Sequence, residues 1–482
     1  MFPFATRCVL FALAASLAIG QQPPNRMLTG TQPFISTLTG QETPVVALVH
    51  VRVIDGTGAP PSEDQTIIIH HGKIAAVGSA STTPVPAGAR QLDLSNHTVI
   101  PGLVGMHEHL FYPSGQGIAQ YNEQAFSFPR LYLASGVTTA RTGGSLEPFT
   151  DLQVKSLIDA GRMPGPKLFI TGPYLEGNGP FLQMHVLQGP QDARKTVEYW
   201  AYEGVTSFKA YMHITRAELS AAVDAAHKLG LKVTGHLCSV GFREAAAIGI
   251  DNLEHGLVVD TEFDPGKKPD DCPSQTVTRD TFIKLDIKSA PVVQTIRDLV
   301  QHKVAVTSTL AVFDAMVPHR PPLEQRFLDV LTPQSALTYM SARARASDAT
   351  NSSALDQLKK EMQFEYDFVR AGGHLMAGVD PTGNGGAMAG FGDLRNLELL
   401  VEAEFTPVEA IKIATYNGAK WLNQQDHIGS IAPGKQADLV VIQGNPAARI
   451  SDVRNIRIVF KDGVGYDPDK LIQSVTGSVG LH

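Results

Sequence analysis

Short apolar runs separated by turn residues occupy the chain directly after residue 44. Three of these runs are rich in β-branched residues, as strands are, and they cover Val45–Val53, Thr66–His70 and Lys73–Val77. His71-Gly72 supplies a tight turn between the last two runs. The same turn-and-strand pattern returns near the other end of the chain. We therefore expect a small β-sandwich domain built from both chain ends, residues 45–100 and 427–465.

Between these two segments, from residue 101 to 426, apolar β runs alternate with amphipathic helical stretches such as Arg216–Leu229. Eight runs are strand candidates: Val99–Met106, Gly136–Arg141, Lys167–Gly172, Thr206–Tyr211, Lys232–Leu237, Asn252–Gly256, Val304–Leu310 and Leu375–Val379. Eight alternations fit an α/β fold of the (β/α)8 TIM barrel type better than a doubly wound sheet. The polar, proline-containing stretch Asp260–Asp280 is expected to be an insertion after the sixth strand.

Composition and charge narrow the class of protein. The 482 residues are 43% hydrophobic and 18% charged, which excludes a disordered chain, a collagen-like fibre and a coiled coil. The formal net charge is −7 and no basic stripe is visible, so nucleic acid is not expected as a partner. The three cysteines, Cys8, Cys238 and Cys272, have no CxxC spacing, and a single Cys238–Cys272 bridge stays open.

Residues 1–20 are typical of a secretory signal peptide. Arg7 is followed by the apolar run Cys8–Ile19, which is too short to span a bilayer, and Ala18 and Gly20 provide the small residues of a cleavage site. An N-terminal core helix is the alternative, although the Gln-Gln-Pro-Pro sequence that follows would continue it poorly. We expect a periplasmic or secreted protein with no stable membrane span.

Candidate chemistry begins with Met106-His107-Glu108-His109 at the end of the first strand candidate of the barrel. Residues i and i+2 of a strand share a face, so His107 and His109 are expected to point into the barrel mouth together. Imidazole nitrogen is a preferred ligand of Zn²⁺. Taken alone, the pair does not distinguish a metal site from satisfied core histidines.

Four later residues occupy equivalent positions and strengthen this interpretation. Lys209, His236, His255 and Asp380 lie near the carboxyl ends of the fourth, fifth, sixth and eighth strand candidates. Barrel enzymes place their catalytic groups at that end. A lysine or an aspartate beside a buried strand also needs a partner, because an unpaired buried charge costs several kcal/mol. Packing alone explains such a set poorly.

This set of residues resembles the amidohydrolase superfamily, in particular its metal-dependent members with an HxH sequence on the first strand. The resemblance covers roughly residues 45–465. It includes the entry Pro101-Gly102-Leu103 before the histidine pair, and the closing segment from Gly429 through Pro433-Gly434-Lys435-Gln436-Ala437-Asp438-Leu439. The tract Leu397–Ala403 is similar to the branch that contains imidazolonepropionase-like proteins and dipeptidases.

The resemblance implies a centre with two divalent metal ions. His107, His109 and Asp380 would hold one ion, His236 and His255 the other, and Lys209 would carry a CO₂-derived carboxylate that bridges them. Zn²⁺ suits histidine ligands best, with Mn²⁺, Fe²⁺ and Co²⁺ as alternatives. An unmodified Lys209 that pairs with Asp380 or with substrate also stays open. In the implied mechanism a metal-activated water attacks a carbonyl carbon, and Asp380 serves as general base and then general acid.

The substrate is less well defined by the sequence. Tyr211, Arg141, His213 and His185 are candidates for binding a substrate carboxylate at the barrel mouth. Tyr211 and His213 also mark a departure, because many dipeptidases of this branch have a small, Gly-rich turn after the fourth-strand lysine. We expect a small-molecule amide or dipeptide substrate. The alternatives are a cyclic amide, lactone or phosphoester on the same site, a deaminase, or a non-catalytic binding protein. A homo-oligomer is compatible with this sequence.

Overall fold

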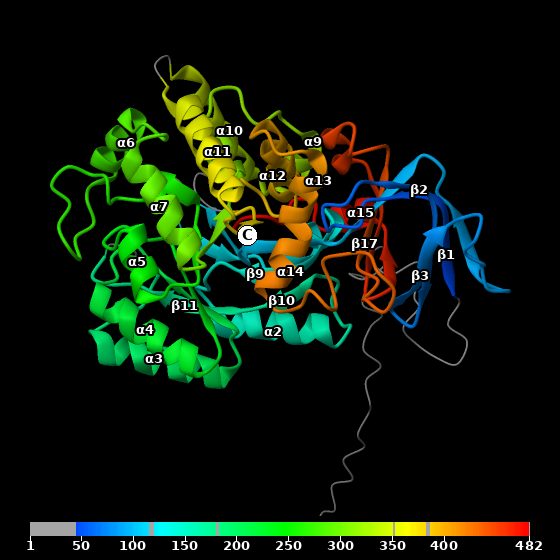
Figure 1. Cartoon of the computed structure of the whole chain (residues 1–482), viewed down its shortest axis with the longest axis horizontal. Coiled ribbons are helices and arrows are strands. Elements are labelled where there is room, and N and C mark those ends of the chain that lie inside the picture. The colour runs from blue at the N-terminus through cyan, green and yellow to red at the C-terminus, as the bar shows by residue number, and fades with distance from the viewer. Residues whose placement is uncertain (1–44, 115–119, 180–182, 350–351, 382–385, 482) are drawn as a thin grey trace, which may run out of the picture.

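The computed structural model describes residues 45–114, 120–179, 183–349, 352–381 and 386–481. The predicted signal peptide at residues 1–20 lies outside these residues. Among the residues described, no helix is long and apolar enough to cross a bilayer. Figure 1 shows a large body of strands and helices, with a separate sheet that contains the first and the last strands of the chain at one side.

This separate sheet joins segments from both ends of the chain, as the sequence predicts. Its eight strands are β19 (Val464–Tyr466), β18 (Ile456–Lys461), β17 (Leu439–Gln443), β5 (His97–Pro101), β1 (Val46–Val53), β2 (Ser62–His70) and β3 (Lys73–Ser79) in spatial order, with β4 (Arg90–Asp93) paired to β1. The connection between the two ends is the antiparallel pair β17–β5, with Val440 opposite Ile100. In the predicted β2–β3 turn, His71 and Gly72 have φ angles of 51° and 77°, the left-handed values that a tight hairpin requires.

The large body contains two parallel sheets and one small antiparallel pair, β7 (Phe111–Ser114) with β8 (Gln120–Glu123). β6 (Leu103–Glu108), β9 (Val137–Thr142) and β10 (Lys167–Phe169) make the first, and β11 (Thr171–Leu175), β12 (Ser207–Ala210), β13 (Lys232–Gly235), β14 (Asn252–Glu254), β15 (Ala305–Ser308) and β16 (Leu375–Ala377) make the second. Every strand candidate of this region corresponds to an observed strand, and the candidate Lys167–Gly172 is divided between β10 and β11. The alternating α/β organisation is therefore confirmed.

The two parallel sheets are connected to each other by hydrogen bonds at two places. The Ser145 amide donates to the Gly172 carbonyl at 3.1 Å, which connects the segment after β9 to β11. The Asp380 amide donates to the His107 carbonyl at 2.8 Å, which connects the segment after β16 to β6. These contacts bring the carboxyl ends of the first and last strands of the body together.

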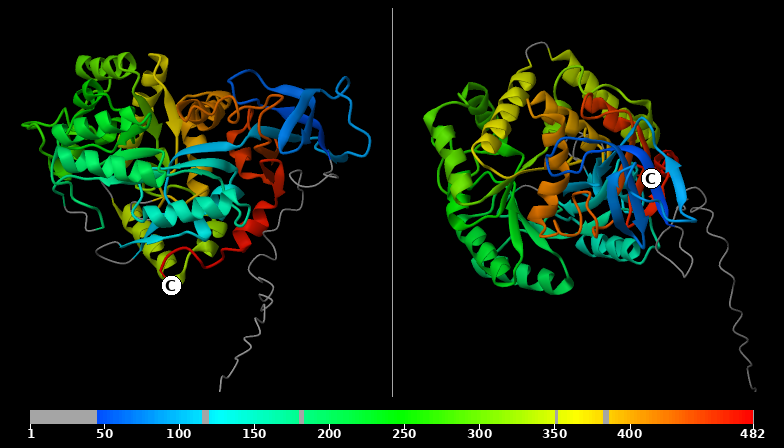
Figure 2. Two further views of the ribbon diagram at one scale, coloured as in Figure 1. Left: turned by 90° about the horizontal axis from the view of Figure 1, so that it is seen from below. Right: turned by 45° about the vertical axis from the view of Figure 1, so that its right-hand side comes forward.

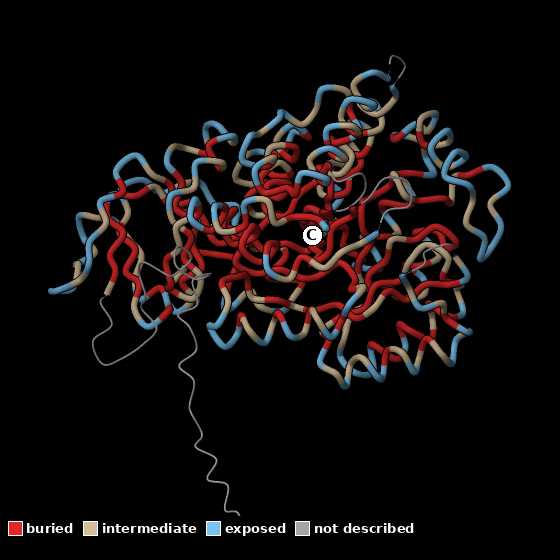
Figure 3. The backbone as a smooth tube through the Cα atoms, turned by 180° about the vertical axis from the view of Figure 1, so that it is seen from behind, coloured by how far each residue is buried: buried red, intermediate tan, exposed pale blue. Residues whose placement is uncertain are grey.

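Helices cover the outer faces of the parallel strands (Figure 2). They are α1 (Ser127–Ala134), α2 (Pro148–Asp159), α3 (Pro190–Glu203), α4 (Arg216–Lys228), α5 (Phe242–Ile248), α7 (Ala290–Gln301), α11 (Ala354–Arg370), α12 (Phe391–Glu402), α13 (Pro407–Lys412) and α14 (Gly418–Trp421). α4 begins with a capping box, in which the Thr215 side chain accepts from the Glu218 amide. The most buried backbone in Figure 3 runs through the strands that these helices enclose.

Two additions to the large body differ from the sequence prediction. The Asp260–Asp280 insertion leads into the helix α6 (Gln275–Lys284), and a disulfide joins Cys238 to Cys272 across it. A second addition after β15 contains α8 (Leu310–Asp314), α9 (Gln325–Val330) and α10 (Pro333–Asp348). α10 leaves Leu337 and Met340 exposed, so its apolar residues make no single buried stripe that a sequence pattern would reveal. Near the end of the chain lies α15 (Pro468–Gln473).

Candidate metal centre

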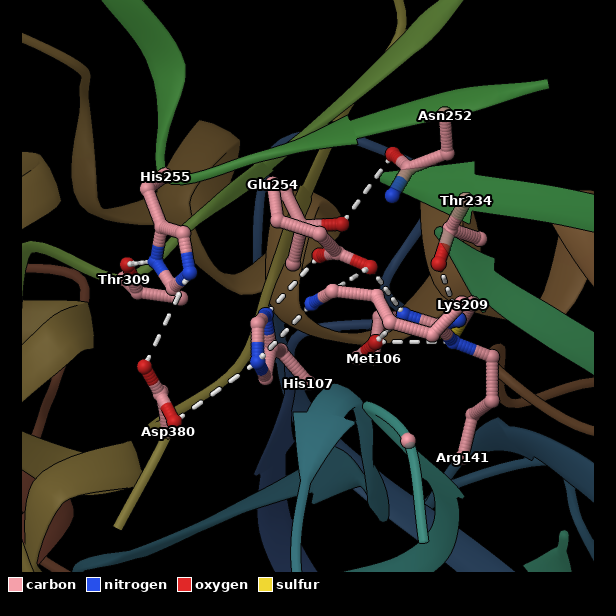
Figure 4. A network of polar contacts seen from close by, with 12 residues as sticks. Met106, His107, Arg141, Lys209, Thr234, Asn252, Glu254, His255, Thr309 and Asp380 are labelled. Atoms are coloured by element: carbon pink, nitrogen blue, oxygen red, sulfur yellow. Dashed lines mark hydrogen bonds and ion pairs between the residues drawn. The ribbon is translucent and has the colours of Figure 1, made fainter. Parts of the chain in front are cut away.

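One cavity of about 360 Å³ opens at the carboxyl ends of the parallel strands. All six residues predicted to hold metal line this cavity: His107, His109, Lys209, His236, His255 and Asp380. They come from five different strands or from the residues directly after them, as Figure 4 shows for four of the six. The fold therefore collects at one place residues that are up to 273 positions apart, from His107 to Asp380.

The two histidines of the HxH sequence are oriented by partners behind them. His107 Nδ1 lies 2.9 Å from Glu254 Oε2, and His109 Nδ1 lies 3.2 Å from the Gly144 carbonyl oxygen, which can only accept. Each ring is left with its Nε2 facing Asp380, at 3.6 Å for His107 and 3.1 Å for His109. A histidine whose second nitrogen is held by a carboxylate or carbonyl is characteristic of a metal ligand.

His255 and Asp380 are held in unusual backbone conformations. Their φ angles are 69° and 47°, in the left-handed region that costs a non-glycine residue about 1–3 kcal/mol. His255 Nδ1 lies 2.8 Å from Thr309 Oγ1, and His255 Nε2 lies 3.8 Å from Asp380 Oδ2. Donor atoms of His107, His255 and Asp380 all lie within 4.8 Å of one another. The backbone strain thus accompanies a geometry that fits a metal ion.

His236 completes the histidine cluster on the far side of His255. The two rings are 4.6 Å apart, and the Tyr211 ring lies 5.1 Å from His236 on its other side. Burial, reinforced by the positive charge of Lys209, lowers the pKa of His236 to about 3 and that of His107 to about 4. Both imidazoles are therefore neutral at pH 7, which is the form that binds metal.

A buried ionic group lies directly beneath these ligands. Glu254 accepts from Arg141 Nη2 at 2.7 Å through Oε1, and the same oxygen is 3.7 Å from Lys209 Nζ (Figure 4). Burial alone would raise the pKa of Glu254, but the charges of Lys209 and Arg141 and the hydrogen bond with His107 outweigh it and hold that pKa well below its usual value. Sequence reasoning missed Glu254, although its position directly before His255 in a buried strand was a signal for it.

Lys209 is 1% exposed and lies among the candidate ligands. Its Nζ is 3.5 Å from His107 Nε2. Burial lowers the pKa of Lys209 to about 8, against the opposing effect of Glu254 and Asp380. The uncharged amine, which is the form that reacts with CO₂, is therefore more abundant near neutral pH than for an ordinary lysine.

The four residues predicted to bind a substrate carboxylate have different positions. Tyr211 lines the cavity, whereas Arg141, His213 and His185 do not. Arg141 is fully buried below the ligands, and its Nε donates to the Met106 carbonyl at 2.9 Å. His213 Nδ1 lies 3.4 Å from Glu176, and His185 Nε2 lies 2.9 Å from Asp192. The expectation for Arg141 is corrected, because its side chain points inward below the mouth and is occupied by Glu254.

The rest of the cavity wall is aromatic and apolar. Its aromatic members are Phe111, Tyr121, Tyr174, Tyr211 and Phe313. Its aliphatic and thioether members are Leu146, Met184, Val259, Val312 and Met316, and Gln275 adds one amide group. Phe111 stacks on the His109 ring at 4.3 Å, so this wall begins directly against the ligand cluster.

Comparison with known proteins agrees with this architecture. A dihydroorotase of Anaeromyxobacter dehalogenans (strain 2CP-C) is 36% identical over 21% of this chain and 22% of its own. An imidazolonepropionase of Desulfotalea psychrophila (strain LSv54 / DSM 12343) is 36% identical over 13% of this chain and 16% of its own. The chain thus spans less than a quarter of the length of these curated relatives.

Among solved structures, an Xaa-Pro dipeptidase with methionine bound in its active site superposes with a TM-score of 0.65 and 21% identity, over 88% of this chain and 100% of that one. This likeness implies a TIM-barrel-like fold for the large body. The model of the amidohydrolase family matches residues 98–465, which is most of the sequence. The predicted family is therefore confirmed: this chain belongs to the amidohydrolase family.

Proposed function

We propose that this chain is a metal-dependent hydrolase that cleaves a carbon–nitrogen bond in a small-molecule amide or dipeptide. One observation carries the proposal. His107, His109 and His255 each have Nδ1 engaged by a partner and Nε2 directed at Asp380. Catalytic metal sites orient their histidines in this way, and the family and its relatives support hydrolysis of this kind of bond.

The residues of the cluster divide into two candidate ligand sets. His107, His109 and Asp380 would hold one divalent ion, and His236 and His255 the second, with Zn²⁺ as the ion that suits imidazole best. Lys209 lies within 3.5 Å of His107 Nε2. As an ammonium it would repel the ions, whereas its carboxylated form offers two oxygens and a negative charge. We therefore propose that Lys209 is carboxylated and that its carboxylate would supply oxygen ligands to both ions.

When bound, the ions supply a Lewis acid for the scissile carbonyl and lower the pKa of the attacking water. Asp380 accepts the proton of that water and delivers it to the leaving nitrogen, acting as general base and then general acid. Although burial raises the pKa of Asp380, the neighbouring histidines hold it well below its usual value, so its carboxylate is ionised at neutral pH. The phenol of Tyr211 lines the same cavity and can donate to a substrate oxygen.

The decisive experiment measures metal per chain by elemental mass spectrometry, on protein purified without chelator, together with turnover of an amide library. We expect about two ions per chain and amide hydrolysis that chelators abolish. Lys209→Met should lower the metal content, and Lys155→Met, which removes a partly exposed lysine of α2 that lies outside the cavity, is the control. Protein that takes up no metal in the presence of Zn²⁺ and bicarbonate would overturn the proposal.

We further infer that the parallel strands close into an eight-stranded barrel, in which β10 and β11 count as one interrupted strand, and that the chain ends form a β-sandwich. The hydrogen bonds from Ser145 and Asp380 that connect the two parallel sheets support the closure. Apolar clusters on both sides of β1, one around Leu48 and one around Val49, support the sandwich.

We also propose that residues 1–20 direct secretion. The Cys238–Cys272 disulfide supports this proposal, because disulfides form in oxidising compartments.

A further inference from the structure

We propose that the cavity selects substrates that present a bulky apolar group and a blocked, uncharged amino terminus, such as N-acylated amino acid amides or N-acyl peptides. Dipeptides with a free ammonium group would be poor substrates. This inference rests on the proposed hydrolytic function and names the substrate class of the same site.

The first support is the composition of the cavity wall. Leu146, Val259, Val312 and Met316 face the cavity together with Phe313, and none of these side chains carries a hydrogen-bonding group. Met316 is 44% exposed, so an apolar surface continues from the ligand cluster to the opening. A substrate group that covers this surface gains hydrophobic free energy in proportion to the apolar area removed from water.

The second support is the location of charge. Among the residues that the structure describes, the only charged side chains on the cavity wall are Lys209 and Asp380, and both belong to the candidate metal centre. Nearby charged groups are engaged elsewhere: Arg141 contacts Glu254, and Glu176 accepts from the His213 amide at 2.7 Å. A substrate ammonium would therefore find no carboxylate that is not already assigned to metal.

The third support is the tyrosine group around the ligands. The rings of Tyr174 and Tyr211 are 4.9 Å apart, and Tyr121 contacts Phe111 at 5.3 Å. These phenols stay neutral and donate hydrogen bonds to carbonyl or carboxylate oxygens, so they suit an acyl group and a C-terminal carboxylate but give an ammonium no anionic partner.

An ammonium buried in this cavity loses its hydration without a compensating ion pair, and the neighbouring divalent ions repel it. An acetylated nitrogen is uncharged, and its carbonyl accepts from a phenol. Phenylalanyl-leucine and N-acetyl-phenylalanyl-leucine differ at this one group. We expect the metal-loaded enzyme to hydrolyse the acetylated peptide with a kcat/KM at least about tenfold higher. Equal or faster hydrolysis of the free dipeptide would overturn the inference.

The same reasoning can be tested by changing the protein instead of the substrate, through a charge introduced in the cavity wall. Met316→Glu puts a carboxylate on the exposed rim of the wall, and Met316→Gln is the matched uncharged control. The glutamate variant should reduce the preference for the acetylated peptide several-fold through a lower KM for the free dipeptide. The glutamine variant should keep the wild-type preference. Identical preferences in both variants would contradict the role of charge.

A binding measurement separates failure of this inference from failure of the hydrolase proposal. 4-Phenylbutanol and 4-phenylbutylammonium contain no hydrolysable bond, so isothermal titration calorimetry of the metal-loaded protein reports on binding in the cavity without any turnover. We expect the alcohol to bind at least about tenfold more tightly. If no amide is hydrolysed but the alcohol binds preferentially, the hydrolase proposal fails and the pocket chemistry holds. Preferential binding of the ammonium, or binding of neither ligand, overturns the inference.

Discussion

Glu254 provides the sharpest test of how the centre is built, because it touches the ligand His107 without lining the cavity. Glu254→Gln preserves the shape of this fully buried side chain and removes its charge. The variant leaves Arg141 buried without its 2.7 Å carboxylate partner, and it weakens the hydrogen bond that fixes the His107 ring. The expected effects therefore fall on metal affinity and on stability.

The magnitude follows from these two contacts. Loss of the partner that orients a ligand histidine lowers metal affinity by about 10–100-fold. Removal of one member of a buried ion pair destabilises a fold by about 3–5 kcal/mol, because the other charge stays buried. Arg141 keeps its 2.9 Å hydrogen bond to the Met106 carbonyl, so we expect the lower end of that range, about 3 kcal/mol.

The assay is competition with a chelator of known affinity for the metal, combined with urea unfolding of the metal-free protein. Glu365→Gln is the matched control, since Glu365 is an equally buried glutamate whose pKa burial and Glu361 raise well above its usual value. Glu365 is therefore protonated, and a neutral amide replaces a neutral carboxyl. Metal affinity within twofold of wild type in Glu254→Gln, with unchanged stability, would refute the assigned role.

Three further predictions follow from the same geometry. Asp380→Asn should lower kcat by about 10²–10⁴-fold with an unchanged circular dichroism spectrum, and near-normal turnover would exclude Asp380 as the proton carrier. The double variant Cys238→Ser/Cys272→Ser should lower the free energy of unfolding by about 4 kcal/mol, measured in urea, because the disulfide closes a loop with a sequence separation of 34. In the metal-free protein, burial lowers the pKa of His236 to about 3 in the folded state. As the pH falls below about 6.5, His236 is therefore protonated in the unfolded chain but not in the folded one, and this proton uptake favours unfolding. From pH 7 to pH 5, wild type should therefore lose about 2 kcal/mol more stability than His236→Gln, and an equal loss in both would contradict the burial of a neutral His236.

The candidate metal ligands can be predicted from the sequence because their positions depend on local features, namely the geometry of single strands and their carboxyl ends. An HxH pair at a strand end shares a face by the geometry of the strand, and parallel strands collect their carboxyl ends at one place. His107, His109, Lys209, His236 and Asp380 accordingly line one cavity in the structure. The same reasoning predicted the position of every parallel strand to within a few residues.

Arg141 shows where such reasoning stops. Its place near the end of β9 is correct, but the direction of its side chain depends on the buried Glu254 of β14, which is 113 residues away. Neither the charge balance beneath the ligands nor the pairing of Arg141 with Glu254 follows from a strand pattern. The helices α9 and α10 were missed for a related reason, because α10 exposes apolar residues such as Leu337 on a surface with no regular stripe.

The charge balance around Lys209 connects carboxylation to metal binding. Without metal, an ammonium at Lys209 lies 3.7 Å from Glu254 and is attracted by Asp380, which offsets part of the cost of its burial. Carboxylation turns this cation into an anion beside two other carboxylates, which is unfavourable until divalent ions arrive. Carboxylation of Lys209 and binding of the divalent ions therefore favour each other, and the coupling is reciprocal.

Bicarbonate should raise the metal affinity of the wild-type chain by about 5–150-fold in a chelator competition, the usual span of such coupling. Lys209→Met should bind metal more weakly and show no response to bicarbonate. A wild-type affinity that is independent of bicarbonate would show that Lys209 stays an unmodified amine.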